Sequence, residues 1–401
     1  MHPGQPVERI YLDNNATTRV DPAVVAAMLP FFTEHYGNPS SHHSFGTAAT
    51  AAIRQARRDL QTLLGAVTET EIMFTGSGTE ADTTAILSVL EMQPGRDEVV
   101  TSAVEHPAVL ALCQYLTKTR GTVVHVVPVD GQGRLDTDAY RRALGPRTAI
   151  VSIMWANNET GTLFPIADLA VQAHAAGALF HTDAVQAVGK VEIDVQAAGV
   201  DLLSLSGHKL HAPKGIGALY VRRGVKLTPL LRGGGQERGR RAGTENVPGI
   251  VGLGRAAELA LTHLPDSGLR LRALRDRLEQ GVLAAIDDVL ITGDREHRLP
   301  NTSNFAFAQI DSDGLLTLLD RAGIACSSGS ACKSGMQGAS HVLRAMRVPA
   351  AAAQGAVRFS LSRETTDSDI DRVLAVLPGI VAHLRRRSAP TVSTSLALHS
   401  A

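Results

Sequence analysis

From about residue 70, short runs rich in β-branched and apolar residues alternate with longer stretches in which apolar residues recur every three or four positions. The longer stretches are typical of amphipathic helices and cover 79–92, 107–120 and 166–177. The short runs are typical of buried strands and cover 71–74, 98–104, 122–129, 148–157, 178–185, 201–206 and 215–223. This alternation predicts an α/β fold with a mostly parallel sheet covered by helices. Such sheets bind ligands at the carboxyl ends of their strands, so polar residues just after a strand are the first functional candidates.

The pattern changes past a Gly/Arg-rich stretch at 233–243. A long helix over 267–286 leads into an extended segment at 301–310, and a strand at 356–362 precedes a closing helix that ends near Arg387. This predicts a second, smaller α+β domain. We expect four parts: an N-terminal segment (1–15) packing with the small domain, a large domain (16–262), the small domain (263–387) and a poorly ordered tail (388–401).

Composition narrows the class of protein. The chain has 401 residues, enough for two domains, and its 39 basic and 39 acidic side chains balance, so nothing indicates a nucleic-acid partner. No apolar run approaches the ~18 residues that suggest a membrane span. The start lacks the basic and apolar regions of a signal peptide. Three cysteines without a CxxC pair suit a reducing compartment, and we expect a cytoplasmic protein.

Two charged residues follow neighbouring strands. Lys209, in "SGHKLHAPKG", emerges from an apolar run, and Asp183 ends the preceding strand in "HTDAVQAVGK". Taken singly, each has an ordinary interpretation, as a solvated loop lysine and as a helix cap. Together they suit pyridoxal phosphate, because a desolvated amine can form the imine while a carboxylate keeps the pyridine nitrogen protonated.

A glycine-rich junction could hold a phosphate. The segment "FTGSGTEADTTAILSVL" runs from a strand through Gly76 to Thr79 into a helix, whose N-terminal N–H groups favour an anion. The same segment also matches the dinucleotide-binding pattern G-x-G-x-x-A, and Glu105 ends the next strand. A dinucleotide site and a plain structural turn are therefore alternative interpretations of this junction. Lys209 and Asp183 favour pyridoxal phosphate, since a dinucleotide site needs neither.

Three further residues are candidates by position. His106 directly follows a strand and could stack on the ring and exchange protons, although a lone histidine there is more often structural. Asn158, in "NNETG", follows another strand and could contact the ring or the substrate, or be a turn residue. Arg358 opens "RFSLSR", and its guanidinium fork suits a carboxylate, the alternative being a surface arginine.

Taken in order, the motifs resemble those of the cysteine desulfurases, pyridoxal-phosphate enzymes of the class V aminotransferase group, and in particular the nitrogen-fixation (NifS-like) type. The likeness runs from about Tyr11 to Arg387. It is carried by "YLDNNATT", "YGNPSS", "EHPAV", "NNETG", "HTDAVQAVGK", "SGHKLHAPKG", "GGGQERGRRAGTENV", "SSGSAC" and "RFSLSR". The resemblance implies transferase fold type I, with a seven-stranded, mostly parallel sheet in the large domain.

The resemblance also implies a role for each matched residue. Lys209 would carry the cofactor and act as base at the substrate Cα, with Asp183 on the ring nitrogen and His106 stacked on the ring. Asn158 would lie near the phenolic oxygen and the substrate, and Arg358 would bind the substrate carboxylate. The remaining cofactor-binding residues are Gln186 at the phenolic oxygen, Gly78, Thr79, Ser206, Gly207 and His208 around the phosphate, and Thr244, which would reach the phosphate of a neighbouring subunit in a homodimer. Without the resemblance, the segment around Thr244 would pass for a flexible linker.

Residues 325–335 read "ACSSGSACKSG". The resemblance implies that this segment carries the residue that takes up sulfur. Cys332 would attack the sulfur of L-cysteine, keep it as a persulfide and pass it to an iron–sulfur scaffold or another acceptor protein. Small residues around it favour mobile backbone, which suits a thiol that works at two places. Cys332 could also transiently ligate a nascent cluster; no resident metal is expected. Lys333 stands where the family more often has threonine, and Cys326 and Cys113 are expected to be buried filler.

The implied activity is conversion of L-cysteine to L-alanine, with sulfur supplied to nitrogenase clusters. An enzymatic alternative is a selenocysteine lyase, or cysteine-sulfinate chemistry, on the same scaffold. Alternatives of another class are a dinucleotide-binding regulator and a non-catalytic assembly scaffold. The scaffold is disfavoured because it would need none of Lys209, Asp183 and Cys332.

Overall fold

The computed structural model describes residues 9–328 and 340–388. Its larger sheet has seven strands in the order β2-β8-β7-β6-β5-β3-β4, and only β8 runs antiparallel to its neighbours. This confirms the predicted mostly parallel seven-stranded sheet. The strands are β2 (Ile72–Thr75), β3 (Glu98–Ser102), β4 (Val123–Val127), β5 (Thr148–Ser152), β6 (Leu179–Asp183), β7 (Leu202–Ser206) and β8 (Gly217–Val221). Strand β2 is as long as its predicted run and shifted by one residue, and the other six are shorter than theirs.

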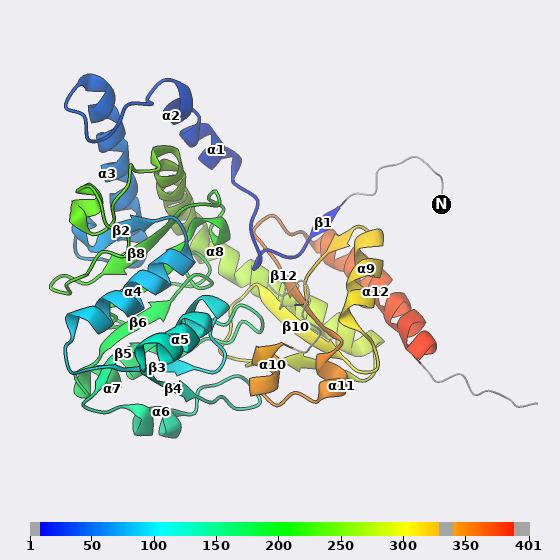
Figure 1. Cartoon of the computed structure of the whole chain (residues 1–401). Helices are drawn as coiled ribbons and strands as arrows, with labels where there is room; N and C mark the ends of the chain where they lie inside the picture. Colours follow the sequence, from blue (N-terminus) through cyan, green and yellow to red (C-terminus); the bar gives the residue numbers. More distant parts are fainter. Residues whose placement is uncertain (1–8, 329–339, 389–401) are drawn as a thin grey trace, which may run out of the picture.

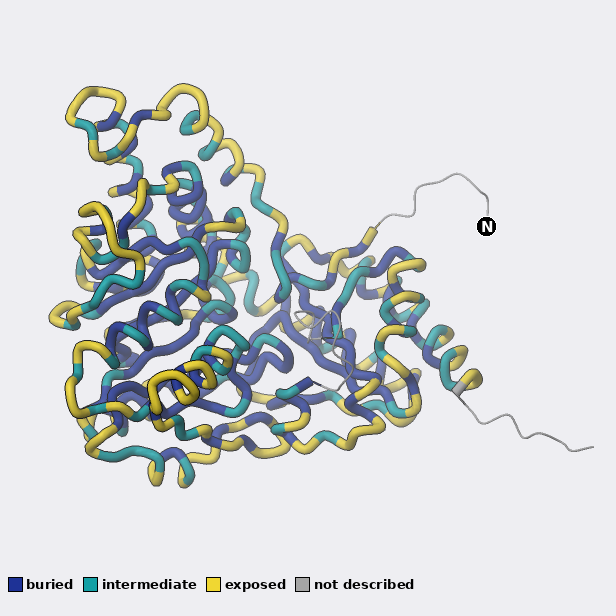
Figure 2. Tube along the Cα trace, in the orientation of Figure 1, coloured by how far each residue is buried: buried dark blue, intermediate teal, exposed yellow. Residues whose placement is uncertain are grey.

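Helices cover both faces of this sheet, which lies buried between them (Figures 1 and 2). Side chains alternate along β7, so that Leu202 packs with one buried cluster and Leu203 with the other. On the Leu202 side lie α4 (Gly78–Met92) and α5 (Pro107–Arg120), and on the Leu203 side lie α3 (Ser44–Leu64), α7 (Ile166–Ala175) and the first half of α8 (Val247–Ala285). A shorter helix, α6 (Thr137–Ala143), precedes β5, and α1 (Pro22–Met28) and α2 (Pro30–Thr33) precede α3.

A second core surrounds a three-stranded antiparallel sheet of order β12-β10-β9. Phe305, Phe307 and Phe359 fill it and are fully buried. The N-terminal strand β1 (Ile10–Tyr11) pairs in parallel with β11 (Ile324–Ala325), and Ile10 and Leu12 belong to the same core. The other elements are β9 (Val289–Thr292), β10 (Thr302–Phe307), β12 (Ala356–Ser360), α9 (Ser312–Arg321), α10 (His341–Ala345), α11 (Ala350–Ala353) and α12 (Asp367–Ser388).

One helix, α8, joins the two cores. It is capped by Asn246, whose side chain accepts from the N–H of Gly249, and it passes through Pro265 without ending. Its residues up to Ala260 pack with the large sheet, and those from Leu271 pack with the small one. The sequence pattern predicted only its second half because a proline usually ends a helix. The proposed division at 262/263 therefore falls inside a continuous helix, and the four-part division stays a prediction.

The Gly/Arg-rich segment is not a flexible linker, because two ion pairs hold it against the large sheet. Arg57 and Glu237 form a buried bidentate pair at 2.7 and 2.8 Å, and Glu237 also accepts from the N–H of Phe74 at 3.1 Å. Arg241 donates to Glu80 at 2.9 Å. Across 9–328 and 340–388, none of the helices has the length and apolar character needed to cross a membrane.

Candidate active site

A cavity of about 320 Å³ opens at the carboxyl ends of β6 and β7. Parallel strands end at the same sheet edge, which brings residues distant in sequence together there. Most of the residues proposed from the sequence line it: Gly78, Thr79, His106, Asn158, Asp183, Gln186, Ser206, His208, Lys209 and Arg358. Asn15, Ala16, Ser77, Asp82, Met154, Ala156 and Val185 complete the wall.

Lys209 ends a single 3₁₀ turn, Gly207–Lys209, directly after β7. Its Nζ donates to the backbone carbonyls of Asn15 and Ala16, both at 2.6 Å. The N-terminal segment therefore lies against the amine. Both of these partners are neutral backbone carbonyls that fix the position of the amine in the cavity.

Asp183 ends β6 and is 6% exposed. Its Oδ1 accepts from the N–H of Val185 at 2.9 Å, so the turn role considered from the sequence is also fulfilled. Burial raises the pKa of Asp183, while the nearby His106 and Lys209 act in the opposite direction. A protonated ring nitrogen in the cavity would supply the cation that this buried carboxylate needs.

The start of α4 has the features of an anion site. Ser77 caps the helix through its Oγ, which accepts from the N–H of Glu80 at 3.1 Å. A Cβ on Gly78 would lie 2.8 Å from Val185 Cγ2, so a side chain there would press on that wall of the cavity. Backbone N–H groups, the helix dipole and the hydroxyls of Thr79 and Ser206 suit a phosphate.

Two histidines border the cavity. His106 caps α5, and its Nδ1 accepts from the N–H of Ala108 at 3.2 Å, so a neutral ring carries its proton on Nε2. Burial lowers the pKa of His106, and it lowers the pKa of His208 to about 4. Both imidazoles are therefore neutral near pH 7, as a ring that stacks and exchanges protons requires.

Arg358 lies in β12 and is 2% exposed. Its Nη1 donates to the carbonyl of Asn158 at 2.8 Å and its Nη2 to Asp13 at 2.7 Å, while its Nε has no hydrogen-bond partner among the described residues. A buried guanidinium with an unused N–H in the cavity wall can take a carboxylate. It belongs to the small sheet, so the site is built from both cores.

The sequence pattern missed three buried residues at this site. Asn15 lies in a motif that was noted, but its role depends on contacts with distant segments. Asp82 lies one turn into α4, and within the described part of the chain its Oδ1 has no hydrogen-bond partner. Glu105 was considered only as a ribose-binding carboxylate, yet its Oε1 accepts from Ser102 Oγ at 2.5 Å and from the N–H of Met154 at 3.0 Å, and it is outside the cavity wall. That placement disfavours a dinucleotide site.

Two of the proposed cofactor residues do not line the cavity. Gly207 is buried beneath it, where a Cβ would lie 2.8 Å from Ile216 Cγ2. Thr244 lines a separate cavity with Gly76 and Arg241.

The structure describes two of the three cysteines. Cys332, the proposed sulfur acceptor, and Lys333 lie outside the described residues. Cys113 is buried, as expected, and burial raises its pKa to about 12. Cys326 is only partly buried, although burial raises its pKa as well. Neither thiol is ionised near neutral pH, so neither is a strong nucleophile.

Together, the cavity offers an amine, a carboxylate for a ring nitrogen, an anion cradle and a guanidinium for a carboxylate. These groups fit a phosphorylated pyridine aldehyde with an amino acid beside it. The described residues contain no cluster of three His, Cys, Asp or Glu side chains that could hold a metal ion.

Comparison with known proteins gives the same answer as this geometry. The class-V aminotransferase family matches residues 10–373. A cysteine desulfurase of Gluconacetobacter diazotrophicus is 68% identical over 379 residues, which cover 94% of this chain and 95% of that protein. The cysteine desulfurase NifS of Azotobacter vinelandii is 59% identical over 379 residues, covering 94% of each chain.

Solved structures are similar over most of the chain. A NifS-like protein superposes with a TM-score of 0.88 at 39% identity, covering 94% of this chain and 100% of that one. The protein SspA in complex with cysteine superposes with a TM-score of 0.76 at 35% identity, covering 88% of this chain and 98% of that one.

The buried carboxyl of Glu105 predicts a pH-dependent stability. Burial raises its pKa to about 8, whereas in an unfolded chain a glutamate titrates near ~4.3. Between these values the folded protein binds more protons, so stability falls as the pH rises and levels off once Glu105 is ionised. Relative to Glu105→Gln, we expect the native free energy of unfolding in urea to fall by up to about 1.4 kcal/mol per pH unit in this window.

Glu296→Gln, at an exposed glutamate, is the matched control and should follow the native curve. Parallel curves for the native protein and Glu105→Gln would contradict the assignment.

Proposed function

The chain belongs to the class-V aminotransferase family and is a pyridoxal-phosphate-dependent cysteine desulfurase, and on this premise we propose how its own residues divide the work. The predicted fold type, cofactor and activity are thereby confirmed. The proposal rests on one observation. Lys209, Asp183 and the start of α4 line the same cavity, and Arg358, which belongs to the small sheet, lines it as well.

When bound, pyridoxal phosphate supplies a ring that withdraws electrons from the substrate Cα. We assign Lys209 to the covalent attachment of the cofactor and to proton transfer at Cα. Asp183 would hold the ring nitrogen, His106 would stack on the ring, and Gln186 would contact its phenolic oxygen. Gly78, Thr79, Ser206 and His208 would hold the phosphate, with Gly207 shaping the turn that carries Ser206 and His208.

Arg358 and Asn158 position the substrate. The guanidinium binds the carboxylate of L-cysteine, using the Nε–H for which residues 9–328 and 340–388 supply no hydrogen-bond partner. Asp13 and the carbonyl of Asn158 already hold the two Nη atoms, so the fork is oriented before the substrate arrives. Preorganisation of this kind lowers the entropic cost of binding.

Cys332 takes the sulfur. Its thiolate attacks the substrate sulfur, an S–S bond forms, and the C–S bond breaks with its electron pair staying on the carbon skeleton, which gains a proton and leaves as alanine. The sulfur remains as a persulfide for an acceptor protein. An iron–sulfur scaffold is the proposed acceptor and nitrogenase cluster assembly the proposed purpose, supported by the likeness to the Azotobacter NifS protein. A selenocysteine lyase would instead release the chalcogen without needing Cys332.

The assignment of Lys209 predicts where the cofactor attaches. The purified native protein should be yellow, and borohydride reduction should leave the cofactor covalently bound to the peptide that contains Lys209. Lys209→Ala should lose both the visible band and the attachment, because no other amine lines the described part of the cavity.

Lys214→Ala is the matched control, an exposed lysine on the same loop, and it should behave like the native protein. Attachment at another lysine, such as Lys190, would overturn the assignment.

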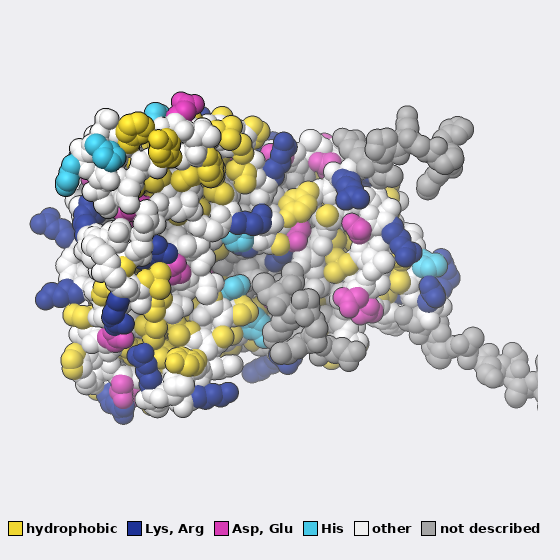
Figure 3. Space-filling view, turned by 45° about the horizontal axis from the view of Figure 1, so that its top comes forward, with side chains coloured by type: hydrophobic (Ala, Val, Ile, Leu, Met, Phe, Trp, Pro, Cys, Tyr) yellow, Lys and Arg dark blue, Asp and Glu magenta, His cyan; other side chains and the backbone are white. Residues whose placement is uncertain are grey.

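We further propose that the enzyme is a homodimer joined through the surface that α1, α2 and the start of α3 form. Large apolar side chains gather there (Figure 3): Val25, Leu29, Phe32, Tyr36 and Phe45 are all at least 43% exposed. An apolar patch of this kind on a globular protein usually marks an interface. The neighbouring residues Pro39 and Ser40 border the same open cavity as Gln236 and Arg238. The patch thus continues to the segment that carries Thr244, which would reach the partner's cofactor phosphate.

A charged residue in this patch should weaken the dimer. We expect the native protein to sediment at twice the mass of one chain and Phe32→Lys to shift toward one chain on dilution, because Phe32 is 59% exposed at the centre of the proposed interface. Leu269→Lys, at a 74% exposed position on α8, is the control and should stay dimeric. A native protein that sediments as a single chain would contradict the proposal.

A further inference from the structure

Arg358 already has a carboxylate partner within the protein. Its Nη2 donates to Asp13 Oδ1 at 2.7 Å, and the two side chains are 2% and 18% exposed. Asp13 is not among the described residues that line the cavity of about 320 Å³, so it can act on a bound amino acid only through Arg358. No role was predicted for Asp13 from the sequence, although it lies in the segment "YLDNNATT".

The backbone holds Asp13 next to Arg358. Asp13 forms a parallel β-bridge with Ser360, which lies in β12 like Arg358. The side chain of Asn14 donates to the carbonyl of Ser360 at 2.9 Å, and the hydroxyl of Tyr11 donates to the carbonyl of Asp13 at 3.1 Å. The carboxylate and the guanidinium thus lie on neighbouring extended segments, and their contact is built into the fold.

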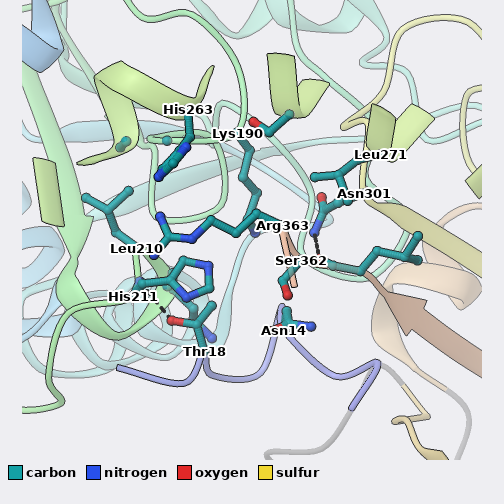
Figure 4. A pocket seen from close by; sticks show the side chains of 15 residues that line it. Asn14, Thr18, Lys190, Leu210, His211, His263, Leu271, Asn301, Ser362 and Arg363 are labelled. Carbon is teal, nitrogen blue, oxygen red and sulfur yellow. Dashed lines mark hydrogen bonds between the residues drawn. The ribbon is translucent and has the colours of Figure 1, made fainter. Parts of the chain in front are cut away.

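The turn that begins at Asp13 also reaches Lys209. The N–H of Ala16 donates to the carbonyl of Asp13 at 3.0 Å, and the carbonyl of Ala16 accepts from Lys209 Nζ at 2.6 Å. Asn14 and Thr18 of the same segment line a small cavity of about 50 Å³ that Lys209 lines as well (Figure 4). One short segment therefore contacts both the amine proposed to hold the cofactor and the guanidinium proposed to bind the carboxylate.

The charges of Asp13 and Arg358 offset each other where they lie. Burial is the largest cause that raises the pKa of Tyr11 and of Cys326, and in both cases Asp13 raises the pKa further while Arg358 lowers it. A buried guanidinium needs a negative partner, and Asp13 supplies one. The carboxylate of an amino acid that reaches Arg358 therefore meets a cation whose charge is already matched, with a second negative group close by.

We propose that Asp13 is a positioning residue that orients Arg358 and competes with the amino acid's carboxylate for its charge, which limits how tightly the site holds that carboxylate. This deepens the proposed function and rests on the assignment of Arg358 to the substrate carboxylate. L-Cysteine and L-alanine carry the same carboxylate, so a stronger grip on it would hold substrate and product alike without speeding the reaction. A counterion that weakens this grip favours release of the product.

Removing the charge of Asp13 should strengthen the binding of a carboxylate. Asp13→Asn keeps an oxygen that can accept from Arg358, so the guanidinium stays oriented while the competing charge is gone. We expect L-alanine, titrated into the loaded enzyme and followed by the change in the yellow band, to bind roughly fivefold more tightly than to the native protein. Ethylamine, which is L-alanine without its carboxylate, should bind as before. The KM for L-cysteine should fall while kcat does not rise.

Three further variants complete the experiment. Asp138→Asn is the matched control, because it removes the exposed ion pair with Arg141 and should leave both affinities native. Asp13→Ser is a second charge-free variant, in which the carbonyl of Asn158 still holds Nη1 of Arg358, and thermal unfolding checks that each variant folds. Arg358→Met should weaken the binding of L-alanine and leave that of ethylamine unchanged.

The outcomes separate this proposal from the proposed function. If Arg358→Met leaves the binding of L-alanine unchanged, the assignment of Arg358 itself is wrong. If Arg358→Met weakens that binding but folded Asp13→Asn and Asp13→Ser bind L-alanine no more tightly than the native protein, only the role of Asp13 is overturned. The same holds if both variants bind ethylamine and L-alanine more tightly to the same extent. A merely structural Asp13 would weaken the binding of both ligands.

Discussion

The site depends on how one asparagine of the N-terminal segment is hydrogen-bonded between the two cores. Asn15 is 1% exposed. Its carbonyl accepts from Lys209 and Gln186, its side-chain oxygen from Lys190 and Asn301, and its Nδ2 donates to Thr302. Strand β1, which precedes it, pairs with β11 of the small core, so the segment cannot shift without breaking strand pairing. The Lys209 amine is thus held by a residue far from it in sequence.

Burial shifts the pKa values of the acidic groups in and around the cavity. Asp82 and Asp183 line the cavity, Glu105 lies outside its wall, and burial raises the pKa of each. Neighbouring carboxylates raise the pKa of Asp82 and Glu105 further, whereas His106 and Lys209 lower that of Asp183. Lys209 and Arg358 line the same cavity. A cofactor with a cationic ring nitrogen and anionic oxygens matches a cavity that holds charged groups of both signs. A cavity so arranged also binds an amino acid, whose carboxylate and amine have opposite charges.

Much of the fold and of the site could be predicted from the sequence because both follow from local patterns. Strands β2, β3 and β5 to β8 are largely buried apolar runs, and β4 is a partly exposed edge strand. Lys209, Asp183 and His106 lie at the ends of such runs, where the ends of parallel strands must meet. The first half of α8 was missed because Pro265 interrupts the helical pattern while packing on both sides preserves the helix. Asn15 could not be assigned because its contacts join the N-terminal segment to Lys209, Gln186 and Thr302, which are far from it in sequence. Arg358 needed the fold as well, since it reaches the site from the second core.

One measurement tests the central claim most directly: that the cavity loosens the sulfur of L-cysteine and Cys332 collects it. The loaded enzyme is mixed with one equivalent of L-cysteine, stopped in acid, and analysed for alanine and for the mass of the peptide that contains Cys332. The account predicts one alanine for each sulfur atom gained on Cys332, and neither product in Lys209→Ala. Alanine formed together with free sulfide while the Cys332 peptide keeps its original mass would contradict it.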